Sequence, residues 1–306
     1  MQATKERDAM DRDGDSINRN LQPAERRAPL PVNGSRMDFG ARSDVGRVRT
    51  NNEDNYVMAP DLNLLVLSDG MGAMASGEVA SRLTVETVRE YYQDAGGNPL
   101  APLVGKPIEE VSEASNRLAS AIQLANRIVY TKAQAAAGHK KMGATVVAVH
   151  YMDGRMSVAH VGDSRAYRLR GESLEQLTRD HSFLAELQQQ PGRYKYDPSN
   201  LQHLLTRAVG IEPEVKVDVR DELVMESDTF LLCSDGLTRE LSDNQIGWVL
   251  RQARTAQDAA EQLVALANEA GGQDNITAIV IRHGSKHSGA QSSLARLRNW
   301  FRGRRN

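Results

Sequence analysis

Leu-Leu-Val-Leu-Ser-Asp-Gly-Met-Gly, at residues 64–72, joins a short apolar run to an acidic turn. The chain repeats this arrangement in residues 157–163, Ser-Val-Ala-His-Val-Gly-Asp, and in residues 230–236, Phe-Leu-Leu-Cys-Ser-Asp-Gly. Short apolar runs that end in Gly and Asp are typical of buried strands followed by turns. The pattern therefore predicts strands whose ends bring several carboxylates to one place.

Five acidic blocks follow one another in a fixed order along the chain. A single Asp-Gly pair indicates only an ordinary turn. The ordered set is a stronger signal, because isolated carboxylates at the ends of buried strands repel one another and lose hydration unless a cation neutralises them. Since the blocks contain neither Cys nor His, their oxygen ligands favour Mg²⁺ or Mn²⁺ over Zn²⁺ and indicate metal-assisted hydrolysis. The acids of these blocks are Glu53, Asp54, Asp69, Asp163, Asp235 and Asp274.

The ordered motifs resemble those of type 2C metal-dependent serine/threonine protein phosphatases of the bacterial kind. The likeness extends from about Met37 to Arg282, most of the chain. It rests on Val-Arg-Thr-Asn-Asn-Glu-Asp (48–54), Asp-Gly-Met-Gly (69–72), Gly-Ala-Thr (143–145), Val-Gly-Asp-Ser-Arg (161–165), Leu-Thr-Arg-Asp-His-Ser (177–182), Leu-Thr-Arg-Ala-Val-Gly (205–210), Ser-Asp-Gly-Leu (234–237) and Gly-Gly-Gln-Asp-Asn-Ile-Thr (271–277). The resemblance implies hydrolysis of phosphate monoesters on proteins phosphorylated by Ser/Thr kinases, through a water that two metal ions activate.

The resemblance implies two tight Mn²⁺ or Mg²⁺ sites. Asp69 would bridge the two ions, and the carbonyl of Gly70 would help to hold the second. Asp235 and Asp274 would complete the set of ligands around the first. Asp163 would hold a third, weaker metal together with Asp235.

The remaining motif residues would support the ions and the substrate. Glu53 and Asp54 would lie beside the second metal, directly or through water. Arg49 would bind the substrate phosphate as a planar bidentate donor. Asn275 resembles a residue that orients the ligands.

One stretch departs from the family pattern. The bacterial family usually continues Asp-Gly-Met-Gly with Gly and often His, whereas Ala73 and Met74 follow here, and Met71 stands where animal relatives carry a His. This departure leaves an alternative: a catalytically weakened phosphatase-fold module that binds a phosphoprotein partner. The complete set of acids favours the enzyme. Cys233, the only cysteine, lies in an apolar run and is expected to be buried rather than nucleophilic.

Composition predicts a single large domain. The 306 residues are 40% hydrophobic and 25% charged, and the net charge of −2 argues against a general nucleic-acid-binding protein. One cysteine excludes a disulfide scaffold. No apolar run approaches the roughly 18 residues of a membrane span. We therefore expect a cytoplasmic, monomeric enzyme.

Both ends of the chain differ from its body. Residues 1–36 are polar, contain Pro23, Pro29 and Pro31, and are expected to be disordered. Residues 37–283 would form the phosphatase domain. Residues 284–306 contain no acid and combine arginines with an apolar helical face, which predicts contact with an anionic membrane or an acidic partner; a solvated end is the alternative.

Within the body, strand pairs alternate with long helices. Residues 55–68 and 146–161 each have the pattern of a β-hairpin. Residues 77–94 and 108–137 have the periodicity of amphipathic helices. Antiparallel hairpins covered by helices predict an α/β (α+β) fold, the four-layer α-β-β-α sandwich with two antiparallel sheets between helical layers that the resemblance also implies.

Local signals add detail to this outline. Ser242 with Gln245, and Thr255 with Asp258, predict the N-terminal caps of two further helices. Residues 181–203 lack a steady period and resemble the flap that borders the active site of bacterial relatives, with a surface insertion as the alternative. His160 is expected to occupy a buried strand position.

Overall fold

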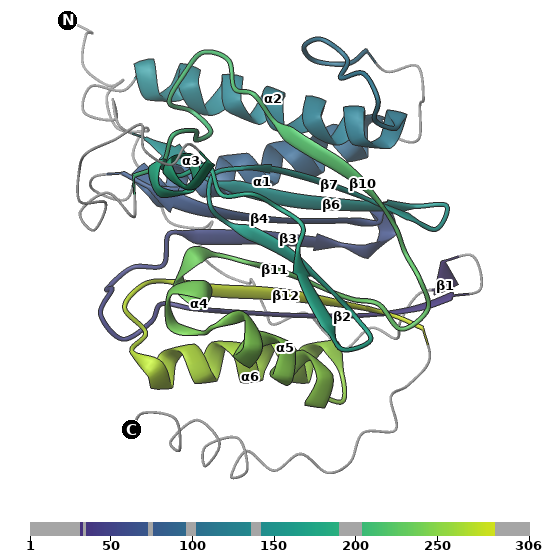
Figure 1. Ribbon diagram of the computed structural model, residues 1–306. Helices are drawn as coiled ribbons and strands as arrows, with labels where there is room; N and C mark the ends of the chain where they lie inside the picture. Colours follow the sequence, from purple (N-terminus) through teal and green to yellow (C-terminus); the bar gives the residue numbers. More distant parts are fainter. Residues whose placement is uncertain are drawn as a thin grey trace, which may run out of the picture.

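The computed structural model describes residues 31–32, 35–72, 76–95, 102–135, 142–189 and 204–284. Figure 1 shows two antiparallel sheets that lie face to face, with helices on both outer sides. The predicted four-layer α-β-β-α sandwich is confirmed. None of the described helices is both long enough and apolar enough to span a membrane.

Each sheet brings together strands that are distant in the sequence. In order across the first sheet, the strands are β1 (Pro31–Val32), β2 (Ser35–Asp44), β12 (Ile276–His283), β11 (Thr229–Cys233), β8 (Arg165–Arg170) and β9 (Ser173–Gln176). Across the second sheet, they are β10 (Asp218–Leu223), β7 (Arg155–Val161), β6 (Val146–Met152), β4 (Leu64–Met71) and β3 (Asp54–Ala59), with β5 (Gly143–Ala144) paired to β4.

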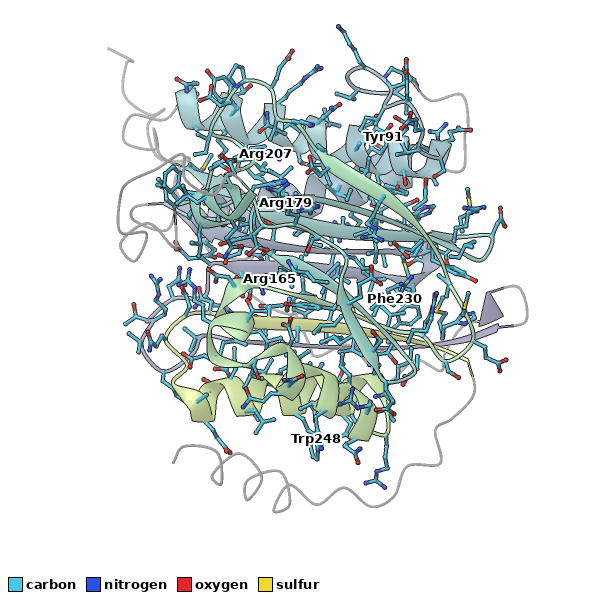
Figure 2. All side chains as sticks on the ribbon, in the orientation of Figure 1. Tyr91, Arg165, Arg179, Arg207, Phe230 and Trp248 are labelled. Atoms are coloured by element: carbon cyan, nitrogen blue, oxygen red, sulfur yellow. The ribbon has the colours of Figure 1, made fainter. Side chains whose placement is uncertain are left out.

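The helices form the outer layers. The second sheet is covered by α1 (Ser76–Ala95) and α2 (Glu113–Ala135), and the first by α4 (Asp235–Glu240), α5 (Asp243–Gln252) and α6 (Ala256–Ala270). Two short helices, η1 (Pro60–Leu62) and α3 (Phe183–Gln189), lie in connections. Figure 2 places Phe230 between the two sheets and Trp248 among the helices that cover the first sheet.

The strand β4 shows why a continuous apolar run forms a central strand. Leu64 and Val66 pack in the core beneath α1 and α2. Leu65 and Leu67 point the other way, into the core between the sheets. Because alternate side chains of a strand face opposite sides, a strand covered on both faces needs apolar residues at every position.

The local predictions for hairpins and caps are confirmed. The first hairpin consists of β3, η1 and β4, and the second consists of β6 and β7. At the second turn, Asp153 (φ 52°) and Gly154 (φ 74°) have the left-handed conformation that a tight hairpin requires. Ser242 and Gln245 form a reciprocal capping box, and the Thr255 hydroxyl accepts a hydrogen bond from the Asp258 N–H at 3.0 Å.

Two predicted boundaries differ from the structure. The helix expected from residue 108 begins at Glu113, because the Asn116 side chain binds both backbone groups of Ile108 instead. Strand β1 and the start of β2 fall within the segment that was expected to be disordered. The expectations for residues 1–30, 73–75, 190–203 and 285–306 lie outside the described residues.

Candidate active site

The ends of five strands bring the predicted acids to one end of the sandwich. Asp54 opens β3 and stands opposite Asp69, near the end of β4. From the other sheet, Asp235 begins α4 immediately after β11, and Asp274 precedes β12. Asp163 lies in the connection from β7 to β8, where the chain passes from one sheet to the other.

The charges of these acids act on one another. Burial raises the pKa of Asp69 well above its ordinary value, and the nearby charges of Asp54, Asp235, Asp163 and Asp274 raise it further. Burial also raises the pKa of Asp54 to about 7, despite two hydrogen bonds to its carboxylate. The pKa of Asp163 is raised to about 7 by burial and by Asp235. Because these carboxylates lie close together and repel one another, binding of a cation among them is favourable.

Asp54 offers an oxygen that the protein does not satisfy. Its Oδ2 atom accepts hydrogen bonds from Ser234 Oγ at 2.8 Å and Thr277 Oγ1 at 2.6 Å. Its Oδ1 atom is buried and has no hydrogen-bond partner among the described residues. A buried carboxylate oxygen without a partner costs free energy, so this atom fits a ligand for a hard divalent cation or for water bound to one.

Asp69 is positioned by two residues that the sequence analysis did not single out. The Asp69 N–H donates to Thr145 Oγ1 at 3.0 Å, and the Asp69 carbonyl accepts from the Thr145 N–H at 2.8 Å. The hydroxyls of Thr145 and Ser164 are 2.7 Å apart. Both residues lie in motifs quoted for the resemblance, but their contacts depend on how β4, β5 and the β7–β8 connection meet.

The block that contains Glu53 is held by backbone contacts. The Gly70 N–H donates to the Glu53 carbonyl at 3.1 Å, and a Cβ atom at Gly70 would lie 2.1 Å from the carbonyl oxygen of Gly77. Asn275 Oδ1 accepts from the Glu53 N–H at 2.8 Å, and Asn275 Nδ2 donates to the Asn51 carbonyl at 2.9 Å. Burial raises the pKa of Glu53, and Arg49 opposes this effect. The contacts of Asn275 are those of an orienting residue.

Two arginines lie at the exposed side of the acids. Arg49 forms an ion pair with Asp274, with Nε and Oδ1 2.9 Å apart, and 52% of its side chain is exposed. Arg239 pairs with Asp235 and with Asp274. The sequence analysis did not single out Arg239, although its position four residues after Asp235, on the helix that Asp235 begins, could have indicated the pair.

The tightest potential metal-binding group of the described residues is a different one. His160, His181 and Asp218 each offer a ligand atom within 4.8 Å of the others. The predicted carboxylates share a region but do not form such a group among the described residues. His160 occupies a buried position in β7, as predicted. Cys233 is buried, and burial raises the pKa of its thiol to about 12, which excludes it as a thiolate nucleophile at neutral pH.

Comparisons with known proteins agree with the observed fold. A protein-family model described as Protein phosphatase 2C matches residues 47–279. The chain is 34% identical to the serine/threonine phosphatase stp of Listeria monocytogenes, over 82% of the chain and 98% of the relative. A crystal structure of the Mycobacterium tuberculosis serine/threonine phosphatase PstP has a TM-score of 0.69 at 31% identity, covering 81% of this chain and 99% of that one. A PstP catalytic domain in complex with two manganese ions has a TM-score of 0.67 at 32% identity, covering 81% and 99%.

Proposed function

The chain belongs to the protein phosphatase 2C family and is a metal-dependent serine/threonine protein phosphatase, and we propose that its hydrolytic centre is the group of acids between the two sheets. The observation that carries this assignment is the position of Asp69, which lies near the end of β4 and is surrounded by the charges of Asp54, Asp163, Asp235 and Asp274. Such a concentration of negative charge fits divalent cations and lies where both sheets end.

We assign two metal positions to these acids. Asp69 would contribute to both, Asp235 and Asp274 to the first, and the Gly70 carbonyl to the second. When bound, two divalent cations supply a water that loses its proton near neutral pH and stabilise negative charge on the phosphoryl oxygens. Mn²⁺ is supported by the manganese complex of a related catalytic domain, and the oxygen ligands also suit Mg²⁺.

The residues around these positions would have supporting roles. Glu53 and Asp54 would hold the second metal directly or through water, and Asp163 would hold a third, weaker one. Arg49 would bind the substrate phosphate. Its half-exposed side chain contacts Asp274, so its guanidinium lies beside the acids and can turn towards a phosphate without leaving the surface.

We also propose where the catalytic domain begins and ends. Residues 37–283 would form the catalytic domain, which acts as a monomer in the cytoplasm on phosphorylated proteins and not on nucleic acids. The described helices and strands lie within residues 37–283, apart from β1 and the first residues of β2. Residues 284–306 would bind an anionic surface.

A direct assay tests the function. The full-length protein should hydrolyse p-nitrophenyl phosphate and a phosphothreonine peptide when Mn²⁺ is present, and a chelator should stop both reactions. Adding excess Mn²⁺ should then restore them. If the chain bound the phosphopeptide but released no phosphate at saturating Mn²⁺, the assignment of a hydrolytic centre would be wrong.

A further inference from the structure

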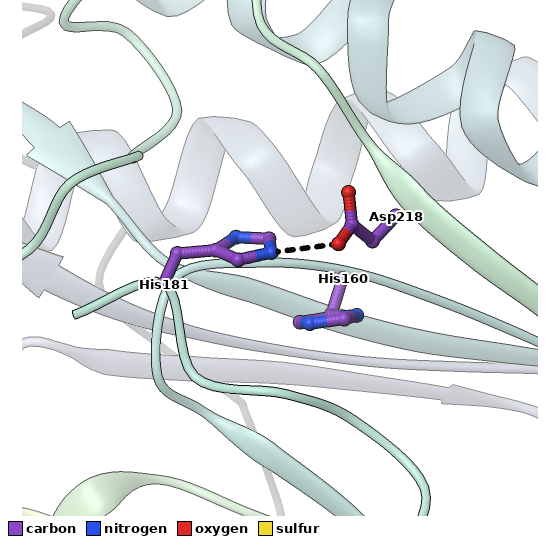
Figure 3. Close-up of side chains that lie close together, drawn as sticks. All are labelled: His160, His181 and Asp218. Atoms are coloured by element: carbon purple, nitrogen blue, oxygen red, sulfur yellow. Dashed lines mark hydrogen bonds and ion pairs between the residues drawn. The ribbon is translucent and has the colours of Figure 1, made fainter. Parts of the chain in front are cut away.

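His181 lies next to the proposed metal site, in a cluster that the proposed reaction does not use (Figure 3). The residue is 3% exposed and immediately precedes the short connection to α3. Its carbonyl accepts a hydrogen bond from the Thr206 N–H at 2.9 Å. His181 therefore belongs to the short stretch, with Ser182 and Phe183, that joins the chain leaving towards α3 to the chain returning from it.

His181 forms two reciprocal hydrogen bonds with Gly162, the residue before Asp163. The His181 N–H donates to the Gly162 carbonyl at 2.9 Å, and the Gly162 N–H donates to His181 Nδ1 at 3.1 Å. Gly162 has a φ of +104°, and a Cβ atom there would lie 2.7 Å from the Thr145 side chain. A glycine in this conformation has few intrinsic restraints, so these two bonds determine the orientation of its peptide groups.

The same contacts determine which ring nitrogen of His181 carries the proton. Because Nδ1 accepts from Gly162, the neutral imidazole carries its proton on Nε2, which lies 3.2 Å from Asp218 Oδ2. Asp218 Oδ1 accepts from Arg207 at 2.7 Å. The hydrogen bonds from His181 and Arg207 lower the pKa of Asp218, so Asp218 is an ionised acceptor that holds the ring from the far side.

His160 completes the support of the ring. The two imidazoles are stacked, with centroids 4.6 Å apart and planes inclined by 20° (Figure 3). His160 Nε2 lies 2.8 Å from the Arg179 carbonyl. Burial and the neighbouring His181 lower the pKa of His160 to about 4, so His160 carries no positive charge near neutral pH.

Two histidines and an aspartate have the composition of a zinc site, but the geometry opposes this interpretation. The lone pairs of nearly parallel, stacked rings do not converge on one point. Binding a cation at His181 Nε2 would move its proton to Nδ1, against the Gly162 N–H. The Arg207 guanidinium already neutralises Asp218. The arrangement fits a chain of hydrogen bonds better than a metal site.

We propose that His181 is a positioning residue that fixes the Gly162 peptide and, through it, the carboxylate of Asp163. The inference rests on the proposed role of Asp163 as a ligand of the third, weaker metal. On the other side of Asp163, Ser164 is already held by Thr145. Gly162 and His181 thus restrain the preceding side, and their loss should affect the weaker metal more than the ions bound by Asp69.

Three substitutions of His181 separate its contacts. His181→Asn places an amide oxygen near the position of Nδ1 and can still accept from the Gly162 N–H. His181→Gln can reach Asp218 with its amide but leaves the Gly162 N–H without an acceptor, and His181→Ala removes both contacts. Asp163→Ala is the reference for loss of the weaker site.

The first measurement is the Mn²⁺ concentration that gives half-maximal hydrolysis of p-nitrophenyl phosphate by the full-length protein. It should rise about 10- to 100-fold in His181→Ala and His181→Gln, the range typical for residues that support a metal ligand, whereas His181→Asn should stay near the wild type. Combining His181→Ala with Asp163→Ala should add little to Asp163→Ala alone. Binding of the tight metals, measured by calorimetry, should be unchanged.

A second measurement does not depend on activity. Hydrogen exchange of the Gly162 amide in the metal-free protein should accelerate in His181→Ala and His181→Gln but not in His181→Asn. Unchanged exchange in all three variants, or equal loss of tight and weak metal binding with a lower melting temperature, would overturn the proposal. So would stoichiometric Zn²⁺ binding that His160→Ala abolishes. If Asp163→Ala leaves the Mn²⁺ requirement unchanged while Asp274→Asn abolishes activity, the proposed function stands and this inference fails.

Discussion

At the scale of single residues, the acids of the site differ in how much the protein itself satisfies them. Asp54 accepts two hydroxyl hydrogen bonds through one oxygen and leaves the other without a partner among the described residues. The Asp274 carboxylate forms ion pairs with Arg49 and Arg239. Asp69 is partly buried and lies among like charges. The environments of Asp54 and Asp69 are costly without a cation, so these two acids are expected to serve ligation rather than folding.

Asp69→Asn and Asp274→Asn should therefore nearly abolish hydrolysis while the fold persists. The loss should exceed the about 10- to 100-fold that residues supporting a ligand typically cost. Removal of a buried like charge from Asp69 should leave the metal-free protein at least as stable. Phosphate release at saturating Mn²⁺ and the melting temperature in chelator are the measurements. Wild-type turnover by Asp274→Asn would contradict the assignment.

Arg49→Ala should separate substrate binding from metal binding. A guanidinium donates hydrogen bonds to phosphate but cannot be a ligand of a cation. We expect kcat/KM for p-nitrophenyl phosphate to fall about 100-fold, as for removal of one preorganised donor, with unchanged Mn²⁺ titration by calorimetry. Arg42→Ala is the matched control, because Arg42 is similarly exposed and pairs with Asp44. Loss of metal binding as severe as in Asp69→Asn would exclude the phosphate role of Arg49.

At the scale of elements, Gly70 near the end of β4 lies very close to Gly77 at the start of α1. Gly70→Ala should destabilise the protein by about 3 kcal/mol and reduce activity, because the new Cβ would meet the backbone of Gly77 at 2.1 Å. Urea unfolding measures the first effect and phosphate release the second. Gly171→Ala is the control, since its Cβ meets nothing within 4 Å and its φ of +58° costs only about 1 to 2 kcal/mol. Full activity in Gly70→Ala would show that the end of β4 and the start of α1 can move apart.

Elements with a strong local signal could be predicted from the sequence. The apolar run of β4 and the Asp153-Gly154 turn depend on residues that are adjacent in the chain. The start of α2 was misplaced because, besides the contacts of Asn116 with Ile108, the Ser112 hydroxyl and N–H bind Asp221, on a strand more than a hundred residues away. The contacts of Thr145 with Asp69 and of His181 with Gly162 were missed for the same reason. Each joins residues that are distant in the sequence and meet only after the sheets have formed.

At the scale of the whole molecule, the acid-free residues 284–306 are predicted to bind an anionic surface. Residues 284–306 lie almost entirely outside the described residues, so their docking stays a prediction. Basic side chains near an anionic surface contribute about 1 kcal/mol each, and salt screens the attraction. Co-sedimentation with phosphatidylserine vesicles should be lost on truncation after Ser288 and should fade with ionic strength. Equal pelleting of both proteins would remove the lipid interpretation, and hydrolysis of p-nitrophenyl phosphate should not change.

Stability of the whole domain should depend on pH through His150, which is partly buried. His150 lies in β6 with its ring centroid 4.9 Å from that of Tyr92, and burial lowers its pKa to about 4. The unfolded chain takes up the proton near pH 6.5, so the contribution of His150 to folding is complete above that pH and is lost as the pH falls towards 4. The loss is on the order of 3 kcal/mol.

The carboxylates with raised pKa act in the opposite direction in metal-free protein, since Asp54 and Asp163 bind protons more readily when folded. The informative quantity is therefore the difference between the wild type and His150→Gln, which leaves those acids in place. Urea unfolding in chelator at pH 7.5 and at pH 4.5 should show that the stability advantage of the wild type shrinks by most of that amount. A difference that stays constant with pH would mean that His150 takes up its proton equally well in the folded and the unfolded chain.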